Sequence, residues 1–354
     1  MTKIYSNQKF LQFPDRLEAI RDRRVVAPVH VRIKPMNHCN HDCWYCAYRV
    51  SNLQLGEDID LKDTIPEDKM FEIVDNILDM GVEAVTFSGG GEPLIYKPLP
   101  EVIRRLAEGG VRVASLTNGS NLKGHVADAF AEHATWVRIS IDSWDDKSYA
   151  ESRKLKIGAF TQVIENIRSF TARGSDCVLG ASFITSKDNV EHIFEACEIL
   201  KDAGVDHVKI AATVISNDAR ENNLYHREIW EEATAQIERA QKLNDQSFTL
   251  VNHYHETEER FEKNYDFCPF LNFLTVIGAD QKVYTCQDKA YNEMGLLGSI
   301  KERSFKTFWF SDENREKMYQ LDPSVSCQHH CVAHTKNLAI MDYLSIDPEH
   351  GRFV

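Results

Sequence analysis

The sequence predicts an α/β protein built on a parallel sheet. Short apolar runs of strand length alternate with segments of helical periodicity between residues 29 and 214. Such alternation is typical of strand–helix–strand units, whose right-handed crossovers make neighbouring strands parallel. Glycine and proline stand at several of the expected helix ends. The expected strands are Val29–Lys34, Ala84–Ser88, Val111–Thr117, Trp136–Asp142, Cys177–Thr185 and His207–Val214.

The helices between these strands are predicted from their apolar faces and their ends. Pro66–Met80 starts on a proline and is followed by Gly81, which is a favourable pair of helix ends. The other helices between strands are expected at Leu99–Gly109, Phe160–Arg173 and Asn189–Gly204. Six strand–helix units in sequence therefore predict a parallel sheet with right-handed crossovers.

Further elements are expected at the two ends of this region. Pro14–Asp22 predicts a short packing helix before the first strand, and Asn222–Asn244 predicts one long helix after the last. Phe248–His255 is a candidate for one more strand, on which His253 and His255 would share a face, and Glu256–Lys263 for another helix. Paired histidines suggest a metal site or a proton relay, but no third ligand stands nearby, so we favour a structural pair.

Composition limits the class of protein. The chain has 354 residues, of which 43% are hydrophobic and 27% charged, as in globular proteins. The net charge of −13 argues against a general nucleic-acid binder. No apolar run is long enough for a membrane span, and no signal peptide is recognisable. Nine cysteines then indicate metal or redox use in a reducing compartment, so we expect a cytoplasmic protein.

Three cysteines follow the first strand within eight residues. Cys39, Cys43 and Cys46 have the spacing C-x3-C-x2-C, and thiolates so close together bind zinc or iron. A zinc site needs a fourth ligand, which His41 could supply. An iron–sulfur cube held by three thiolates keeps one iron open. These residues alone leave both alternatives open.

A second motif, Gly89-Gly90-Gly91-Glu92-Pro93, follows the second strand, and the aromatic Tyr45 stands just before the third cysteine. In this order and at this separation, the motifs resemble the radical S-adenosylmethionine (SAM) enzymes. The resemblance implies that Cys39, Cys43 and Cys46 hold a catalytic [4Fe–4S] cluster whose open iron binds SAM. It also implies that the glycine motif meets the SAM amino group, and that the fold is a partial (β/α)6 barrel with its chemistry at the carboxyl ends of the strands.

The resemblance implies further SAM contacts after the third and fourth strands. Thr117 and Asn118 belong to a Thr-Asn-Gly turn, and Ser140 to an S-x-D run. The serine and an arginine on the following helix, Arg153, would hold the methionine carboxylate, because a guanidinium binds a carboxylate through two parallel hydrogen bonds. Asp142 is expected to meet substrate or a neighbouring turn. The expected cofactor-binding residues are Tyr45, Gly89, Gly90, Gly91, Glu92, Thr117, Asn118, Ser140 and Arg153.

Four further cysteines lie in the last ninety residues. Cys268 and Cys286 flank a predicted hairpin at Leu274–Thr285, and Cys327 and Cys331 follow with C-x3-C spacing. A helix is expected at Ser304–Phe310. This region resembles the auxiliary-cluster extension of radical SAM enzymes in its short "twitch" form, related to the SPASM domain, which implies a second, fully ligated [4Fe–4S] cluster.

A four-cysteine zinc site is the alternative for this region, and His329, His330 and His334 could compete as ligands. Some relatives have C-x2-C for the downstream pair. The expected domains are an N-terminal helical segment at 1–29, the barrel at 30–255 and the auxiliary extension at 256–354.

Two cysteines remain inside the barrel region. Cys177 starts a strand and Cys197 lies in mid-helix, so both are expected to be small buried side chains. The alternative is a thiol that returns a hydrogen atom to a substrate radical.

The resemblance implies cleavage of SAM to a 5′-deoxyadenosyl radical that abstracts hydrogen from the substrate. An external one-electron donor, such as flavodoxin or ferredoxin, would supply the first cluster. The auxiliary cluster would accept an electron from the substrate, so we favour oxidation to a ketone of a small hydroxyl-bearing molecule, namely a sugar, polyol or aminocyclitol. One alternative is crosslinking or epimerisation of a ribosomally made peptide. Another is a non-catalytic iron–sulfur electron carrier, against which the glycine motif argues because a carrier needs no SAM.

Overall fold

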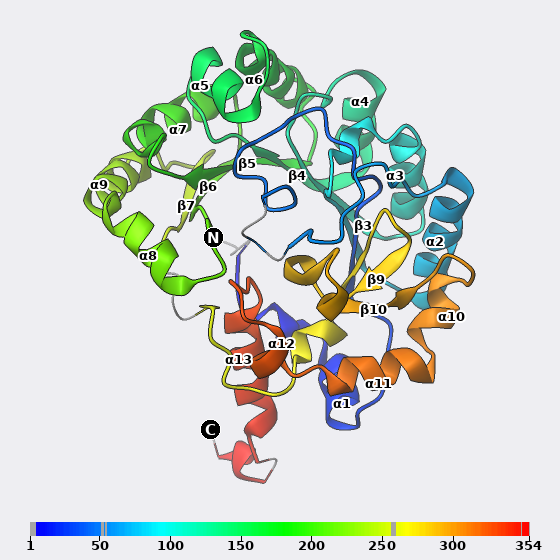
Figure 1. Cartoon of the computed structure of the whole chain (residues 1–354). Helices are drawn as coiled ribbons and strands as arrows, with labels where there is room; N and C mark the ends of the chain where they lie inside the picture. Colours follow the sequence, from blue (N-terminus) through cyan, green and yellow to red (C-terminus); the bar gives the residue numbers. More distant parts are fainter. Residues whose placement is uncertain (1–4, 51–52, 54, 256–259, 348, 354) are drawn as a thin grey trace.

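The computed structural model of the chain describes residues 5–50, 53, 55–255, 260–347 and 349–353. One ten-stranded sheet organises them, with the strand order β10-β9-β8-β1-β2-β3-β4-β5-β6-β7. Figure 1 shows the strands curving around a central space, with helices α2 to α9 in a ring outside them.

Strands β1 to β7 are parallel to their neighbours and lie in sequence order. The predicted α/β fold is therefore confirmed, and the candidate seventh strand is present. The bounds are β1 His30–Ile33, β2 Ala84–Phe87, β3 Arg112–Thr117, β4 Ala134–Ser140, β5 Val178–Thr185, β6 His207–Ala212 and β7 Thr249–His253.

The four helices predicted between the barrel strands lie close to their predicted positions, whereas α4 was not predicted. Helix α2 starts after Pro66, and Gly81 ends it with a left-handed φ of 71°. Helix α7 is shorter than expected, because a 3₁₀ turn at Val190–His192 precedes it. The bounds are α1 Pro14–Arg21, α2 Glu67–Met80, α3 Leu99–Glu108, α4 Gly124–His133, α5 Asp146–Arg153, α6 Ala159–Thr171 and α7 Ile193–Asp202.

The prediction of a single long helix at Asn222–Asn244 is wrong. The segment forms two helices, α8 Ala219–Arg227 and α9 Trp230–Gln241. The end of α8 is fixed by the buried side chain of His226, whose ring contacts the Thr213 carbonyl oxygen at 2.8 Å and the Tyr254 hydroxyl at 3.0 Å. The helix predicted at Glu256–Lys263 lies partly outside the described residues.

The predicted hairpin continues the barrel sheet. Strand β8 (Leu274–Ile277) pairs in parallel with β1, and the antiparallel strands β9 (Lys282–Tyr284) and β10 (Leu296–Ser299) follow. Trp309 of the predicted helix is fully buried, and its Nε1 donates to the Val26 carbonyl oxygen at 2.8 Å. The predicted domain boundaries stay a prediction. The sheet continues across the second boundary, at 255/256, because β7 lies before it and β8 after it. The last helices are α10 Phe305–Trp309, α11 Asp312–Gln320, α12 Pro323–Ser326 and α13 His334–Ser345.

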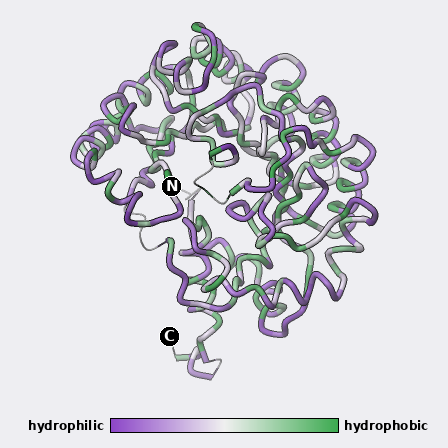
Figure 2. Tube along the Cα trace, viewed as in Figure 1, coloured by the Kyte–Doolittle hydropathy of each residue, from purple (hydrophilic) through white to green (hydrophobic). Residues whose placement is uncertain are grey.

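The first strand shows how the two faces of the sheet differ. Val31 and Ile33 are fully buried in the main core cluster, whereas the alternate residues His30 and Arg32 line the central space. In Figure 2, hydrophilic and hydrophobic stretches alternate along the outer helices, as expected of helices with one buried face. None of the helices in the described part of the chain has the length and apolarity that crossing a membrane would need.

Candidate active site

The three cysteines of the first motif lie in the loop that follows β1. All three are half-buried and free of disulfides. The end of α5 holds the loop in place, because the Asp42 and Trp44 amides donate to the carbonyl oxygens of Arg153 and Ser152 at 3.0 and 3.2 Å. Burial raises the pKa of the Cys39 thiol to about 11, so a thiolate there requires a bound metal to stabilise it.

The glycine motif packs directly on the segment that precedes Cys39. The Gly91 amide donates to the Met36 carbonyl oxygen and the Glu92 amide to that of His38, both at 3.0 Å. A Cβ on Gly91 would lie 1.9 Å from the His38 oxygen, so a larger residue cannot fit. The Gly89 carbonyl oxygen accepts from Lys34 Nζ at 2.8 Å. Sequence reasoning did not single out this fully buried lysine.

Glu92 joins the glycine motif to the turn after β3. Its Oε1 accepts from Thr117 Oγ1 at 2.5 Å, and its Oε2 accepts from the Asn118 amide at 2.8 Å. The Asn118 side chain in turn donates to Asn40 Oδ1 at 2.9 Å, next to the first cysteine. The structure thus brings Glu92, Thr117 and Asn118 together, with the carboxylate directed at the turn.

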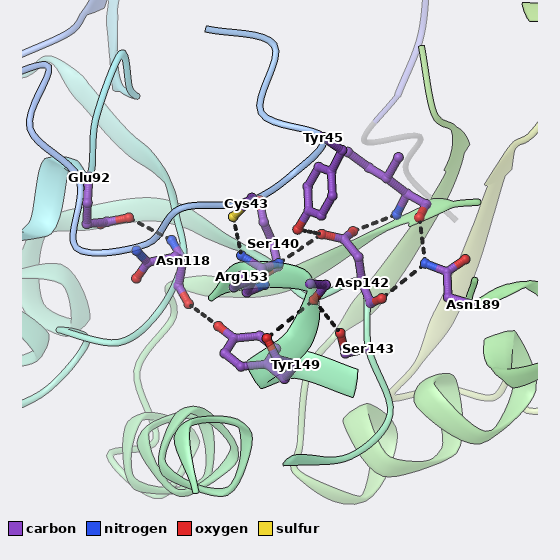
Figure 3. A network of polar contacts seen from close by, with 12 residues as sticks. Cys43, Tyr45, Glu92, Asn118, Ser140, Asp142, Ser143, Tyr149, Arg153 and Asn189 are labelled. Carbon is purple, nitrogen blue, oxygen red and sulfur yellow. Dashed lines mark hydrogen bonds and ion pairs between the residues drawn. The ribbon is translucent and has the colours of Figure 1, made fainter. Parts of the chain in front are cut away.

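A buried ion pair lies at the end of β4 (Figure 3). Arg153 Nη2 lies 2.8 Å from Asp142 Oδ2, and both side chains are only 2% exposed. The same nitrogen donates to the Ser140 carbonyl oxygen at 2.9 Å, and the Tyr45 hydroxyl donates to Asp142 Oδ2 at 2.6 Å. Asp142 also accepts from the Ile184 amide at 2.7 Å. The resemblance placed only Ser140 and Arg153 at one site, and Asp142 was expected to meet substrate or a neighbouring turn, so the ion pair was not predicted.

Arg153 also faces the cysteine loop. Its Nη1 lies 3.7 Å from Cys43 Sγ, and its Nε has no hydrogen-bond partner although it is buried. The guanidinium carbon lies 4.6 Å from the centre of the Tyr149 ring. Arg153 is therefore rigidly held beside Cys43 with one donor still unsatisfied.

His41, the possible fourth ligand of a zinc site, packs edge-on against Tyr149 with ring centres 5.9 Å apart. Burial and the charge of Arg153 lower its pKa to about 3. In the parts of the chain that the structure describes, no three His, Cys, Asp or Glu side chains are grouped so that they could hold a single metal ion.

The four C-terminal cysteines line one small cavity. Apolar side chains line it together with Lys263 and His329, and the Asn337 side chain donates to Cys268 Sγ at 3.4 Å. The structure therefore brings together all four residues predicted as ligands. They are Cys268, Cys286, Cys327 and Cys331.

Two buried lysines accompany these cysteines. Lys263 and Lys289 are 4% and 1% exposed, and Lys263 Nζ donates to the carbonyl oxygens of Arg260, Phe261 and His329. Burial raises the pKa of Cys327, whereas the charges of the two lysines lower it. The lysines thus offset part of the negative charge that thiolates would bring. Sequence reasoning missed them because single lysines in loops usually lie at the surface.

A larger cavity of about 850 Å³ occupies the centre of the barrel. Tyr45 of the cysteine loop lines one part of it, and His253 and His255 line another. Phe270 and His329 line both this cavity and the small four-cysteine cavity. His329 is buried and its Nε2 has no hydrogen-bond partner. A molecule in the barrel would therefore lie beside both cysteine sites.

The remaining two cysteines are buried in the main core cluster, as expected. Cys177 is 6% exposed and Cys197 is fully buried. Neither lines the central cavity.

Comparison with known proteins agrees with this geometry. Residues 33–195 match the family model of the radical SAM superfamily. The chain carries a radical SAM domain. Among curated relatives, it is 34% identical over 120 residues to an S-adenosylmethionine-dependent nucleotide dehydratase of Lacinutrix mariniflava, over 34% of this chain and 24% of that protein. It is 32% identical over 143 residues to a probable GTP 3′,8-cyclase of Halobacterium salinarum, over 39% of this chain and 38% of that one.

The chain thus spans about a quarter to two fifths of the length of these curated relatives. Among solved structures, SuiB of Streptococcus suis, bound to its precursor peptide SuiA, has the same fold. The TM-score is 0.60 at 16% identity, over 89% of this chain and 72% of that one.

A domain of the radical SAM superfamily implies a [4Fe–4S] cluster and SAM. The residues at the end of β1 fit both groups. Three half-buried thiols lie in one loop, Cys43 among them 3.7 Å from Arg153 Nη1, a glycine motif without side chains packs beside the loop, and the Arg153 Nε is left to donate. The particular SAM contacts and the auxiliary cluster belong to the proposal that follows.

Proposed function

We propose that this protein is a radical SAM oxidoreductase that oxidises a hydroxyl-bearing carbon of a small molecule to a ketone. The observation that carries the proposal is that the four-cysteine cavity shares Phe270 and His329 with the central cavity. An electron acceptor must lie close to the substrate, and a cluster held by these cysteines would do so. The curated relatives are named for a dehydration and a cyclisation, so the choice of oxidation rests on the C-terminal cysteines.

The groups that the chain would bind supply the radical chemistry. When bound, the first cluster and SAM provide one-electron cleavage to a carbon radical that can take a hydrogen atom from substrate, and the second cluster provides an electron acceptor. An external one-electron donor, such as flavodoxin or ferredoxin, is part of the proposal.

The protein's own residues have positioning roles in this reaction. Cys39, Cys43 and Cys46 would hold the first cluster, and Ser140 and Arg153 the methionine end of SAM. Asp142 fixes the orientation of the arginine through the 2.8 Å ion pair. Glu92 fixes the turn of Thr117 and Asn118, which would face SAM with Tyr45 and the glycine motif.

The barrel also surrounds the proposed reaction on several sides. The central cavity is lined from strands β1 to β7, from the N-terminal segment and from α13. A substrate contacted from these sides would be held in one orientation.

The test is the coupling between SAM cleavage and product. In a Cys268→Ala/Cys286→Ala variant, SAM cleavage should persist while the ratio of 5′-deoxyadenosine to oxidised product rises. The matched control is Cys177→Ala/Cys197→Ala, which removes two cysteines from the core and should leave the ratio unchanged. The assay uses anaerobically isolated protein and a panel of sugars, polyols and aminocyclitols, with iron and zinc measured in parallel.

The proposed oxidation would be refuted by an unchanged ratio of 5′-deoxyadenosine to product in a Cys268→Ala/Cys286→Ala variant that lacks auxiliary iron. Zinc in the four-cysteine site would also refute it. Product mass distinguishes the reaction classes. Oxidation removes two hydrogens from a small molecule, whereas the peptide alternative changes the mass or structure of a peptide. Failure to bind SAM would instead favour the electron-carrier alternative.

A further inference from the structure

The wall of the central cavity is strongly basic. Seven lysine and arginine residues line it, whereas Asp288 is the one carboxylate among the described residues that does so. The whole chain has a net charge of −13, so the excess of positive charge is local to the cavity. Four of the seven are half-buried on separate helices and strands, namely Arg32 of β1, Arg138 of β4, Lys209 of β6 and Lys336 of α13. The other three are Lys9, Arg112 and Arg260.

These four cations have no carboxylate within ion-pair distance in the part of the chain that the structure describes. The Nε atoms of Arg32 and Arg138 are buried and have no hydrogen-bond partner. Arg138 Nη1 donates to the Tyr5 hydroxyl at 3.1 Å, and Lys336 Nζ lies 4.7 Å from the centre of the Phe270 ring. Their hydrogen-bond and ring partners are thus neutral groups. The charge of Asp288 acts to raise the pKa of Arg32 and of Lys336, but one carboxylate offsets only part of the positive charge of the four.

The cations are also close enough to repel one another. Burial lowers the pKa of Lys209 to about 8, and the charges of Arg138, Arg260, Lys336 and Arg32 add to this effect. The four side chains are half-buried, and partly desolvated charge with little counter-charge destabilises a folded protein. Residues kept at such a cost usually serve binding, and a group of cations around one cavity attracts an anion.

We propose that the small-molecule substrate is phosphorylated. Its phosphoryl group or groups would bind to Arg32, Arg138, Lys209 and Lys336. This inference rests on the proposed function. A phosphoryl group carries nearly two negative charges and three acceptor oxygens, so it can contact several of these cations at once. A carboxylate carries one charge and two oxygens, and would leave most of the group unpaired. The substrate class narrows to a phosphorylated sugar or polyol, because the same cations would repel an unmodified aminocyclitol.

The cavity is large enough for such a molecule. Its volume of about 850 Å³ lies within the range of sites for drug-sized ligands. Tyr45 and Ile184 line the same cavity near the proposed SAM site. Phosphoryl groups held at the basic wall would therefore leave the hydroxyl-bearing part free to face the cysteine loop.

The experiment measures binding without turnover. Inorganic pyrophosphate, ribose 5-phosphate, ribose and malonate are titrated by calorimetry into the anaerobic holoenzyme at 0.15 M salt. Pyrophosphate and ribose 5-phosphate should bind, whereas ribose should bind at least tenfold more weakly. Arg138→Gln/Lys209→Gln should weaken pyrophosphate binding about tenfold to hundredfold, since each lost contact involves a charged group.

The matched control, Arg104→Gln/Lys187→Gln, removes two exposed cations outside the cavity and should leave binding unchanged. A second readout is the thermal midpoint without ligand. It should rise in Arg138→Gln/Lys209→Gln, because the substitution relieves repulsion, and it shows that the variant is folded.

Three results would overturn the inference. They are tighter binding of malonate than of both phosphorylated probes, equal binding of ribose and ribose 5-phosphate, and undiminished pyrophosphate binding in the cavity variant. None of these three results depends on the ratio of 5′-deoxyadenosine to oxidised product in the Cys268→Ala/Cys286→Ala variant. If the phosphorylated probes bind but that ratio is unchanged, the substrate class stands and only the proposed oxidation is rejected.

Discussion

The buried pair of Asp142 and Arg153 gives the sharpest test of the site geometry. Asp142→Asn keeps the shape of the side chain but removes its charge, so Arg153 stays buried at 2% exposure without a counter-ion. Removing one partner of such a pair costs about 3–5 kcal/mol. The substitution also weakens the acceptor of the Tyr45 hydroxyl and of the Ile184 amide. We therefore expect the free energy of unfolding to fall by about 3–5 kcal/mol.

The assay is urea unfolding of the apoprotein under reducing conditions, followed by tryptophan fluorescence. The control Asp128→Asn breaks an exposed pair with Arg173, whose side chains are 64% and 27% exposed, and should cost about 0–1 kcal/mol. In the double variant Asp142→Asn/Arg153→Gln the loss should be smaller than the sum of the two single losses. Equal losses in Asp142→Asn and Asp128→Asn, or additive losses in the double variant, would show that the pair does not act as a unit.

Three further expectations concern the cofactors and partners. Replacing Cys39, Cys43 and Cys46 together with alanine should remove about four irons and abolish SAM cleavage while the auxiliary iron remains; retained cleavage would contradict the assignment. Glu92→Gln and Ser140→Ala should each weaken SAM binding by about tenfold to hundredfold without loss of iron, as measured by equilibrium dialysis, and unchanged affinity in both would reject these positions. A random oligonucleotide should show no salt-sensitive submicromolar binding in fluorescence anisotropy, because the chain has a net charge of −13 and phosphate contacts dominate such binding.

The sheet and both cysteine sites could be predicted from the sequence because their signals are local. Apolar runs bounded by glycine or proline placed strands β1 to β7 to within about two residues, which is the usual scatter of strand and helix ends. The motif cysteines and the glycine motif follow strands directly, so a parallel sheet brings them to one edge. The four C-terminal cysteines converge in the structure as predicted, although more than fifty residues separate the first from the last.

The features that could not be predicted depend on contacts between distant residues. The break between α8 and α9 follows from His226 bonding to Thr213 and Tyr254, which helical periodicity does not encode. The pairing of Asp142 with Arg153 joins a strand end to a helix end, and only the fold brings the two together. Both are cases in which tertiary contacts override local preference.

The basic cavity does have a signal in the sequence. His30 and Arg32 alternate with Val31 and Ile33 in the first strand, and Lys209 lies between the apolar Val208 and Ile210 of β6. The apolar residues are fully buried, whereas these polar ones face the barrel interior. In a parallel strand covered by helices, period-two polarity thus indicates a polar interior.

The sheet also fixes the relation between the two cysteine sites. Strand β8 pairs with β1 in parallel from His30 opposite Leu274 to Ile33 opposite Ile277, so the two segments that carry the sites are held by one hydrogen-bonded register. Lys34, directly after β1, lies between them. Burial lowers its pKa, whereas the charges of Cys46 and Cys286 raise it. Because strand register cannot slip without turning buried side chains outward, the sheet itself sets the separation of the two cysteine groups, and the proposed oxidation would need no movement of one group against the other.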